Sequence, residues 1–387
     1  MEVKSRGFAG RFTDRVIILT AVVCVFLPGL LSLAAEAVLA AALLICRRTR
    51  SLVFSSRLSL WLIPIAPAAI IPPIVYRNYV GIVAGVGLVL LLVLAIYLMK
   101  AMTAEIFEQA TKYACAASVI VMFAAIFERI AYAVWPQIAQ NKDLRCSGVF
   151  FNPNLFGTAV VFIILTCLYK IMSGRGDRRI YTAVIAANLI NMALCGSMLG
   201  MAELVVGVFF LLLFNRKWIF VGIFALFAAA GVGAVILHPQ LLPRVFEASE
   251  SFNLRVRVWQ LALMLFKETP IFGRGILTYM TFSPQYAGAD LGFNVWVTTC
   301  AHSLLLDSLL CLGIVGTVLL IGFLVHYYVP VIRSRMQKRD TALTALALAV
   351  TMGVLFHGLM DETVAWPQVT ILFLLILSGA ANAAKKE

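Results

Sequence analysis

The sequence predicts an all-helical protein that lies in a membrane, and three observations support this prediction. Of the 387 residues, 62% are hydrophobic and only 13% are charged, whereas a soluble domain carries about 25% charged residues. The apolar residues form runs close to the 17 to 25 residues that a bilayer-spanning helix needs. The charges, with a net value of +13, sit in short clusters between these runs. This distribution favours contact with membrane lipids and argues against nucleic acid.

The apolar runs predict about twelve transmembrane helices in one polytopic integral membrane domain over residues 1–387. In chain order they lie near residues 16–31, 33–46, 58–75, 79–99, 112–134, 151–171, 180–196, 199–214, 218–237, 302–328, 342–358 and 366–384. The segment 16–46 has a second interpretation, a re-entrant hairpin kinked at Pro28-Gly29. No repeat of fixed period is visible, and no segment is long enough to form a separate soluble domain.

The basic clusters predict the orientation of these helices. With twelve spans, the clusters fall on the side of the N-terminus, and the positive-inside rule then places both termini in the cytoplasm. These clusters are Arg47–Arg50, Arg175–Arg179, Arg216-Lys217, Arg333–Arg339 and Lys385-Lys386. The opposite side holds residues 238–301 and a turn at Asp361-Glu362, which is expected to be solvated.

Residues 238–301 form the longest interval that no continuous apolar run bridges, and we expect the active site in this outer loop. Asn253 is a candidate cap for a helix over 254–267. Its apolar residues favour an interfacial helix that lies on the outer membrane face. Pro270 to Gly275 follows as a turn whose glycines let backbone N–H groups face a ligand.

Arginines in and near this loop are the first candidates for a binding site. Arg255, Arg257 and Arg274 lie in the loop, and Arg145 precedes Asn152-Pro153-Asn154, a pattern typical of a helix start. Arginine binds phosphate through paired, permanently charged hydrogen bonds. The alternative is that these side chains reach out to anionic lipid head groups, and that the 145–154 segment is only a capped helix start.

His302 is the candidate catalytic base, with Asp307 close by at the start of a predicted helix. A neutral imidazole takes a proton from a hydroxyl near neutral pH, although a structural hydrogen bond is the plainer interpretation. The eight cysteines show no metal-ligand spacing, so no metal centre is predicted. For Cys146 and Cys300, two free thiols are favoured over a disulfide. No Walker loop, dinucleotide fingerprint or Asp-x-Asp motif is present, so no nucleotide cofactor is predicted.

The order of four features resembles the O-antigen ligase and O-antigen polymerase family of bacterial envelope enzymes. They are Gly148-x-Phe150-x-Asn152-Pro153-Asn154, Arg255-x-x-x-Trp259, Pro270-x-Phe272-Gly273-x-Gly275, and Ala301-His302-Ser303 followed by Gly313-x-x-Gly316. The motifs cover roughly residues 145 to 320, and the layout of many helices with one large outer loop also fits. Met198 stands where the family often has an arginine, and Cys311 stands where it often has an acidic residue.

The resemblance implies a glycosyltransferase of the GT-C type in the bacterial plasma (inner) membrane. Such an enzyme moves a glycan from an undecaprenyl diphosphate carrier to a hydroxyl of an acceptor glycan at the outer face, with no metal or other cofactor. By match to the family motifs, His302 would be the base or orient the acceptor, and Arg255 would bind the diphosphate. Arg257, Arg274 and Arg145 would assist.

Several functional alternatives stay open. Nothing separates a ligase from a polymerase, although polymerisation of a surface polysaccharide is slightly favoured because no feature indicates a lipopolysaccharide acceptor. A flippase for lipid-linked glycans, or another secondary transporter, would also be basic and polytopic, but predicts internal repeats and charges at the midplane. A non-catalytic envelope-assembly protein is the third alternative, if Met198 signals lost activity. Substituting Arg145 or Arg257 for the family arginine, or a different donor, would also account for Met198.

Overall fold

A computed structural model describes residues 8–138, 144–238, 240 and 244–382, without the side chains of residues 8, 9 and 244–249. The described chain is all-helical. Its α-helices are α1 Phe8–Val25, α2 Gly29–Ile45, α3 Arg47–Phe54, α4 Leu62–Val75, α5 Tyr79–Ala101, α6 Ala104–Val134, α7 Pro153–Met172, α8 Arg178–Cys195, α9 Met198–Phe214, α10 Trp218–Leu237, α11 Arg244–Glu268, α12 Thr278–Phe282, α13 Leu304–Met336, α14 Thr341–His357 and α15 Pro367–Asn382. Short 3-10 turns cover Arg57–Trp61, Pro136–Ile138, Ser283–Tyr286 and Thr363–Ala365.

The prediction of twelve spans is wrong. By length and composition, six described helices can cross a membrane, or seven if α2 and α3, which meet at 89°, form one broken span. The six are Arg57–Val75, Tyr79–Ala101, Ala104–Val134, Pro153–Met172, Trp218–Leu237 and Leu304–Met336. Apolar runs overstated the count because several become helices of fewer than 18 residues, among them α9, α14 and α15. The cytoplasmic placement of both termini was built on twelve spans and stays a prediction.

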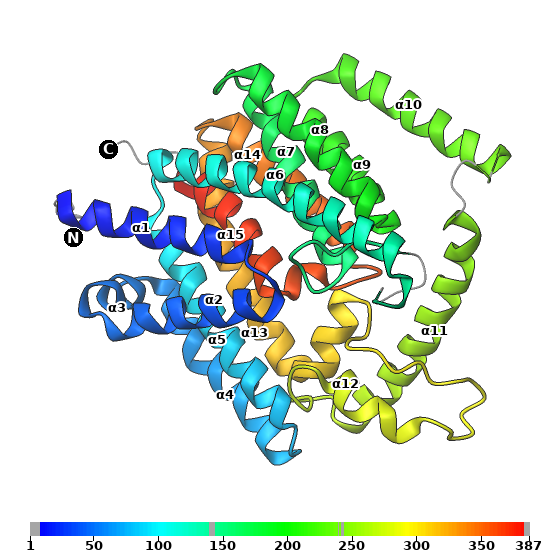
Figure 1. The fold of residues 1–387 in the computed structure, drawn as a ribbon. Coiled ribbons are helices and arrows are strands. Elements are labelled where there is room, and N and C mark those ends of the chain that lie inside the picture. The colour runs from blue at the N-terminus through cyan, green and yellow to red at the C-terminus, as the bar shows by residue number, and fades with distance from the viewer. Residues whose placement is uncertain (1–7, 139–143, 239, 241–243, 383–387) are drawn as a thin grey trace.

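The core lies around α7 and α15. In α7, 83% of the most apolar window is buried, and nearly every residue of α15 is buried. Figure 1 shows α15 crossing the middle of the molecule, with α13 close to it. By contrast, α10 lies at the periphery and none of its residues is buried. An apolar helix this exposed is suited to lipid contact.

The loop after α11 and a break in α13 hold each other in place. Gly313 has φ 65° and ψ −175°, so it interrupts the helix. The N–H groups of Ile314 and Val315 then donate to Pro270 O (2.9 Å) and Ile271 O (3.0 Å), and Gly275 N donates to Cys311 O (2.8 Å). The Pro270–Gly275 turn predicted from sequence therefore fills the break in α13. It binds the helix backbone, so its glycines serve packing here.

The predicted helix in the outer loop is longer than expected. α11 begins at Arg244, about ten residues before Asn253, which therefore is not its cap. Its buried residues Val258, Leu261 and Leu265 pack against Tyr279 and Leu310 in a second hydrophobic cluster. α11 is thus anchored to α12 and α13, and its position at the membrane surface stays a prediction.

Gly313→Ala tests the contact between the loop and the helix break. A Cβ at this position would meet Ile271 O at 2.3 Å, and the positive φ is strained for alanine. We expect the free energy of unfolding to fall by about 2–4 kcal/mol, measured as a lower Tm in detergent. Gly222→Ala in α10 is the control, because no atom lies within 4 Å of its added Cβ. Equal Tm values for the two variants would contradict the proposed fit.

Candidate functional site

A cavity of about 230 Å³ collects residues from four separate parts of the chain. It is lined by Arg145, by the start of α7, by the segment 296–302, and by the link between α14 and α15. Three of the residues predicted from sequence, Arg145, Asn154 and His302, line it together. Its size and mixed polar and apolar wall are typical of a small-ligand site, although at the lower end of the usual range.

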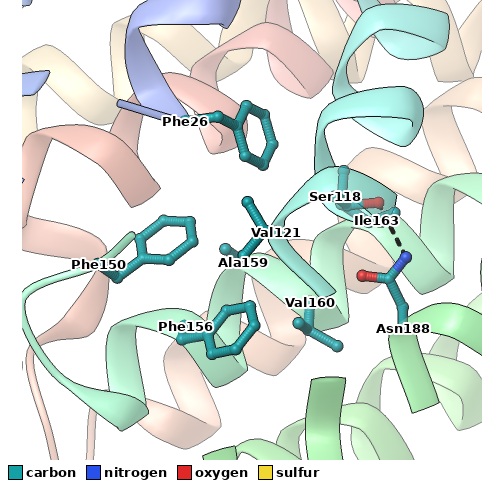
Figure 2. A pocket seen from close by; sticks show the side chains of 9 residues that line it. All are labelled: Phe26, Ser118, Val121, Phe150, Phe156, Ala159, Val160, Ile163 and Asn188. Carbon is teal, nitrogen blue, oxygen red and sulfur yellow. Dashed lines mark hydrogen bonds between the residues drawn. The ribbon is translucent and has the colours of Figure 1, made fainter. Parts of the chain in front are cut away.

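A second cavity, beside Phe150 and Phe156, does not qualify as a substrate site. Figure 2 shows its lining, which is apolar except for Ser118 and Asn188, whose side chains are hydrogen-bonded at 2.9 Å. Its volume is about 10 Å³, room for one water at most. The 230 Å³ cavity is therefore the candidate site.

His302 is held in the wall of this cavity in an unusual conformation. Its φ of 48° lies in the left-handed region, which a non-glycine residue adopts only when its surroundings impose it. Nδ1 lies 3.2 Å from Asp361 Oδ1, Nε2 lies 3.2 Å from Thr298 Oγ1, and the ring stacks on Trp296 at 5.5 Å. A carboxylate at Nδ1 favours a proton on that nitrogen, which leaves Nε2 with a lone pair.

Asp361 is the group that joins the segments around the cavity. Its carboxylate lies near His302, accepts from Asn154 Nδ2 at 2.8 Å and accepts from the Glu362 N–H at 3.0 Å. Burial would raise the pKa of Asp361, but the hydrogen bond and charge of His302, with the charge of His357, outweigh burial and hold it below the usual value. Asp361 is therefore the ionised partner of His302.

Two neighbouring acids are kept protonated. Burial, followed by the nearby charges of Asp361 and Asp307, raises the pKa of Glu362 well above its usual value. Burial, followed by the charge of Glu362, likewise raises the pKa of Cys300. The solvated turn expected at Asp361-Glu362 is wrong, because each of the two residues is only 5% exposed.

Asn154 connects Asp361 to Arg145. α7 begins at Pro153, and Asn152 Oδ1 accepts the N–H groups of Asn154 and Leu155 at 2.9 Å each, which confirms the predicted helix start. The Oδ1 of Asn154 accepts from Arg145 Nη2 at 2.7 Å and from Ser197 Oγ at 3.1 Å. This fixes the amide, so its Nδ2 points to Asp361.

The loop arginines do not all reach the cavity. Arg255 lies beside it: Nε donates to Met360 O at 3.0 Å, and Nη1 donates to Ser251 Oγ at 2.6 Å. Arg257 is half-buried on α11 and makes no polar contact with any side chain that the structure describes. Arg274 is occupied elsewhere, since it pairs with Glu268 and lies over the rings of Tyr76 and Phe282.

Asp307 supports the site from behind. Its Oδ1 accepts the N–H of Ala301 at 2.9 Å, which fixes the residue just before His302. Asp307 does not line the cavity, so its role in the structure is to position the His302 segment. Cys146 and Cys300 are both free thiols.

Sequence reasoning missed several residues of the site. Asp361, Trp296 and Thr298 line the cavity, and a buried pair lies behind its wall, where His357 Nδ1 is 2.6 Å from Glu203 Oε2. Thr158 Oγ1 donates to Thr363 at 2.9 Å and links this pair to the cavity wall. One signal was present: acidic residues are scarce in this chain, and a carboxylate in an apolar run is usually paired or functional.

Residues 182–321 match the family model described as O-Antigen ligase. The chain carries an O-antigen ligase domain. The match includes Arg255, Arg257, Arg274, His302 and Asp307, while Arg145, Asn154 and Asp361 lie outside it. A comparison with curated proteins finds no match. The O-antigen ligase domain therefore supplies one wall of the cavity, and helices on both sides of it supply the rest.

Glu128 in α6 positions the segment that carries Arg145. Its carboxylate accepts the N–H groups of Ser147 at 3.1 Å and Gly148 at 2.8 Å, and it accepts from Tyr132 Oη at 2.7 Å. A carboxylate that accepts several hydrogen bonds in a partly buried site is costly to remove.

Glu128→Ala is expected to lower the free energy of unfolding by about 2 kcal/mol, because two backbone donors lose their acceptor. The measurement is Tm in detergent. Glu105→Ala, an exposed residue at the start of the same helix, is the control and should shift stability by less than about 1 kcal/mol. A smaller effect for Glu128 than for Glu105 would rule out the clamp.

Proposed function

We propose that the chain is a metal-independent glycosyltransferase that transfers a glycan from an undecaprenyl diphosphate carrier to an acceptor hydroxyl. The O-antigen ligase domain implies glycosyl transfer and lipid-linked glycan substrates. The observation that carries the proposal is the Asp361–His302 pair in the wall of a cavity, with Arg255 tied to the backbone of Met360, next to Asp361.

The acceptor half of the reaction falls to His302. Nε2 takes the proton of the acceptor hydroxyl as the oxygen forms a bond to the donor's anomeric carbon. Asp361 keeps the proton on Nδ1 and stabilises the imidazolium that forms, as a buried carboxylate does in a Ser-His-Asp triad. Thr298 and the stacked Trp296 limit the rotation of the ring.

The donor half falls to arginines. The bond between the anomeric carbon and the diphosphate breaks, and negative charge grows on the leaving phosphate oxygen. Guanidinium groups stabilise such charge without a metal ion. Arg145 lies in the cavity wall, Arg255 lies next to it, and the nearby Arg257 has no polar partner among the described side chains. Arg274 is withdrawn from this role, because Glu268 and two aromatic rings already hold it.

The enzyme is proposed to act at the outer face of the bacterial plasma membrane, with polymerase and ligase reactions as the two candidate outcomes. Both reactions use the same donor and the same proton transfer. They differ in the acceptor, which is a second lipid-linked glycan for a polymerase and a different envelope glycan for a ligase.

Glycan transfer by purified protein in lipid, with undecaprenyl diphosphate-linked repeat units as donor, tests the proposal. Wild type should lengthen the glycan with or without EDTA. His302→Ala should lower the rate at least about 10³-fold, and Arg255→Ala about 10²-fold with a higher KM for the donor. His238→Ala, an exposed histidine, is the matched control. Full activity in His302→Ala would remove this mechanism and favour transport or scaffolding.

Asp361→Asn tests the role of the buried carboxylate. The amide keeps the size of the side chain but can donate to Nδ1, which favours the tautomer with its proton on Nε2. We expect kcat to fall about 10²- to 10⁴-fold while KM for the donor changes little. A kcat within about twofold of wild type would show that His302 does not depend on Asp361.

A further inference from the structure

Four side chains beside the cavity are placed as a metal-binding group. Cys300, His302, Asp361 and Glu362 each offer one ligand atom, and these four atoms all lie within 4.8 Å of one another. Across residues 8–138, 144–238, 240 and 250–382, this is the one group of three or more such side chains. Sequence spacing concealed it, because the two halves of the group are 59 residues apart.

The donor set indicates the class of cation. One sulfur, one imidazole nitrogen and two carboxylate oxygens suit Zn²⁺ and its relatives, whereas Mg²⁺ and Ca²⁺ prefer oxygen alone. His302 Nδ1 lies 3.2 Å from Asp361 Oδ1 and 3.7 Å from Cys300 Sγ. Tetrahedral bonds of about 2.0–2.3 Å separate neighbouring ligands by about 3.3–3.7 Å, so these contacts already have the required spacing.

A second observation also indicates a missing cation. Glu362 is 5% exposed, and its Oε2 is buried with no hydrogen-bond partner among the described residues. The nearby guanidinium groups are directed elsewhere, since Arg145 donates to Asn154 and Cys195 O, and Arg255 donates to Met360 O and Ser251. A divalent cation would bind this oxygen and balance the charge of the adjacent carboxylates.

We propose that Cys300, His302, Asp361 and Glu362 bind a divalent cation of the Zn²⁺ class, and that the bound cation switches glycan transfer off. Binding replaces the protons on Cys300 Sγ, His302 Nδ1 and Glu362, which pass to solvent, and four metal–ligand bonds form. Asp361 then bonds to the cation in place of His302.

Inhibition follows from the two nitrogens of the imidazole. A neutral imidazole that binds a cation through Nδ1 carries its one proton on Nε2, so Nε2 cannot accept a proton from the acceptor hydroxyl. This inhibitory half rests on the proposed function, in which Nε2 of His302 is the base. The binding half does not, and it is measured without any glycan substrate.

Co²⁺ titration of the metal-free protein in lipid tests binding. Wild type should show saturable absorption of tetrahedral Co²⁺, with a thiolate-to-Co²⁺ charge-transfer band. Cys300→Ser should lose that band, and Glu362→Gln should bind about 10- to 100-fold more weakly. Cys146→Ser, which removes another buried thiol, is the matched control and should resemble wild type. No saturable band, or an unchanged band in Cys300→Ser, would overturn the site.

Zn²⁺ titration of glycan transfer tests the switch. Zn²⁺ should inhibit wild type, a chelator should restore the rate, and Cys300→Ser should require about 10-fold more Zn²⁺ for the same inhibition. Activation by Zn²⁺, with an inactive metal-free protein, would overturn both the switch and the metal-independent mechanism. If no donor is transferred by any variant, the Co²⁺ spectra still decide whether the site exists.

Discussion

The hydrogen bonds of Asp361 are the interaction on which the candidate site depends. Its carboxylate joins His302 in one segment to Asn154 at the start of α7, and both lie next to the link between α14 and α15. A buried carboxylate is tolerated only when partners replace the water it has lost. The need to satisfy this one group therefore brings together parts of the chain that are about 150 and 60 residues away from it.

Backbone geometry provides the frame for these bonds. The break at Gly313 lets the Pro270–Gly275 turn pack into α13, and α11 is held against the same helix through Val258 and Leu261. Asp307, one turn into α13, then fixes Ala301 and the strained His302. Strain of this kind persists where the surroundings over-determine it, which is common at functional sites.

The sequence predicted the parts of this structure that depend on local pattern. Apolar runs located most helices, and Asn152-Pro153 located the start of α7, because capping and periodicity are local effects. The span count failed because an apolar run does not reveal whether its helix reaches 18 residues, as α9 and α15 do not. Asp361 was missed because its partners are distant in the chain, and because adjacent acids usually indicate a solvated turn.

The position of Arg145 bears on the family arginine that Met198 replaces. Ser197 caps α9 and donates to Asn154, so the turn before α9 lies against the start of α7. Arg145 donates from Nε to Cys195 O in that same turn, and from Nη2 to Asn154. A guanidinium group is thus present beside the turn at which the family pattern places its arginine, but it comes from the segment before α7. A phosphate responds to the location of positive charge and donors, whichever residue supplies them, so Met198 by itself does not argue against phosphate binding.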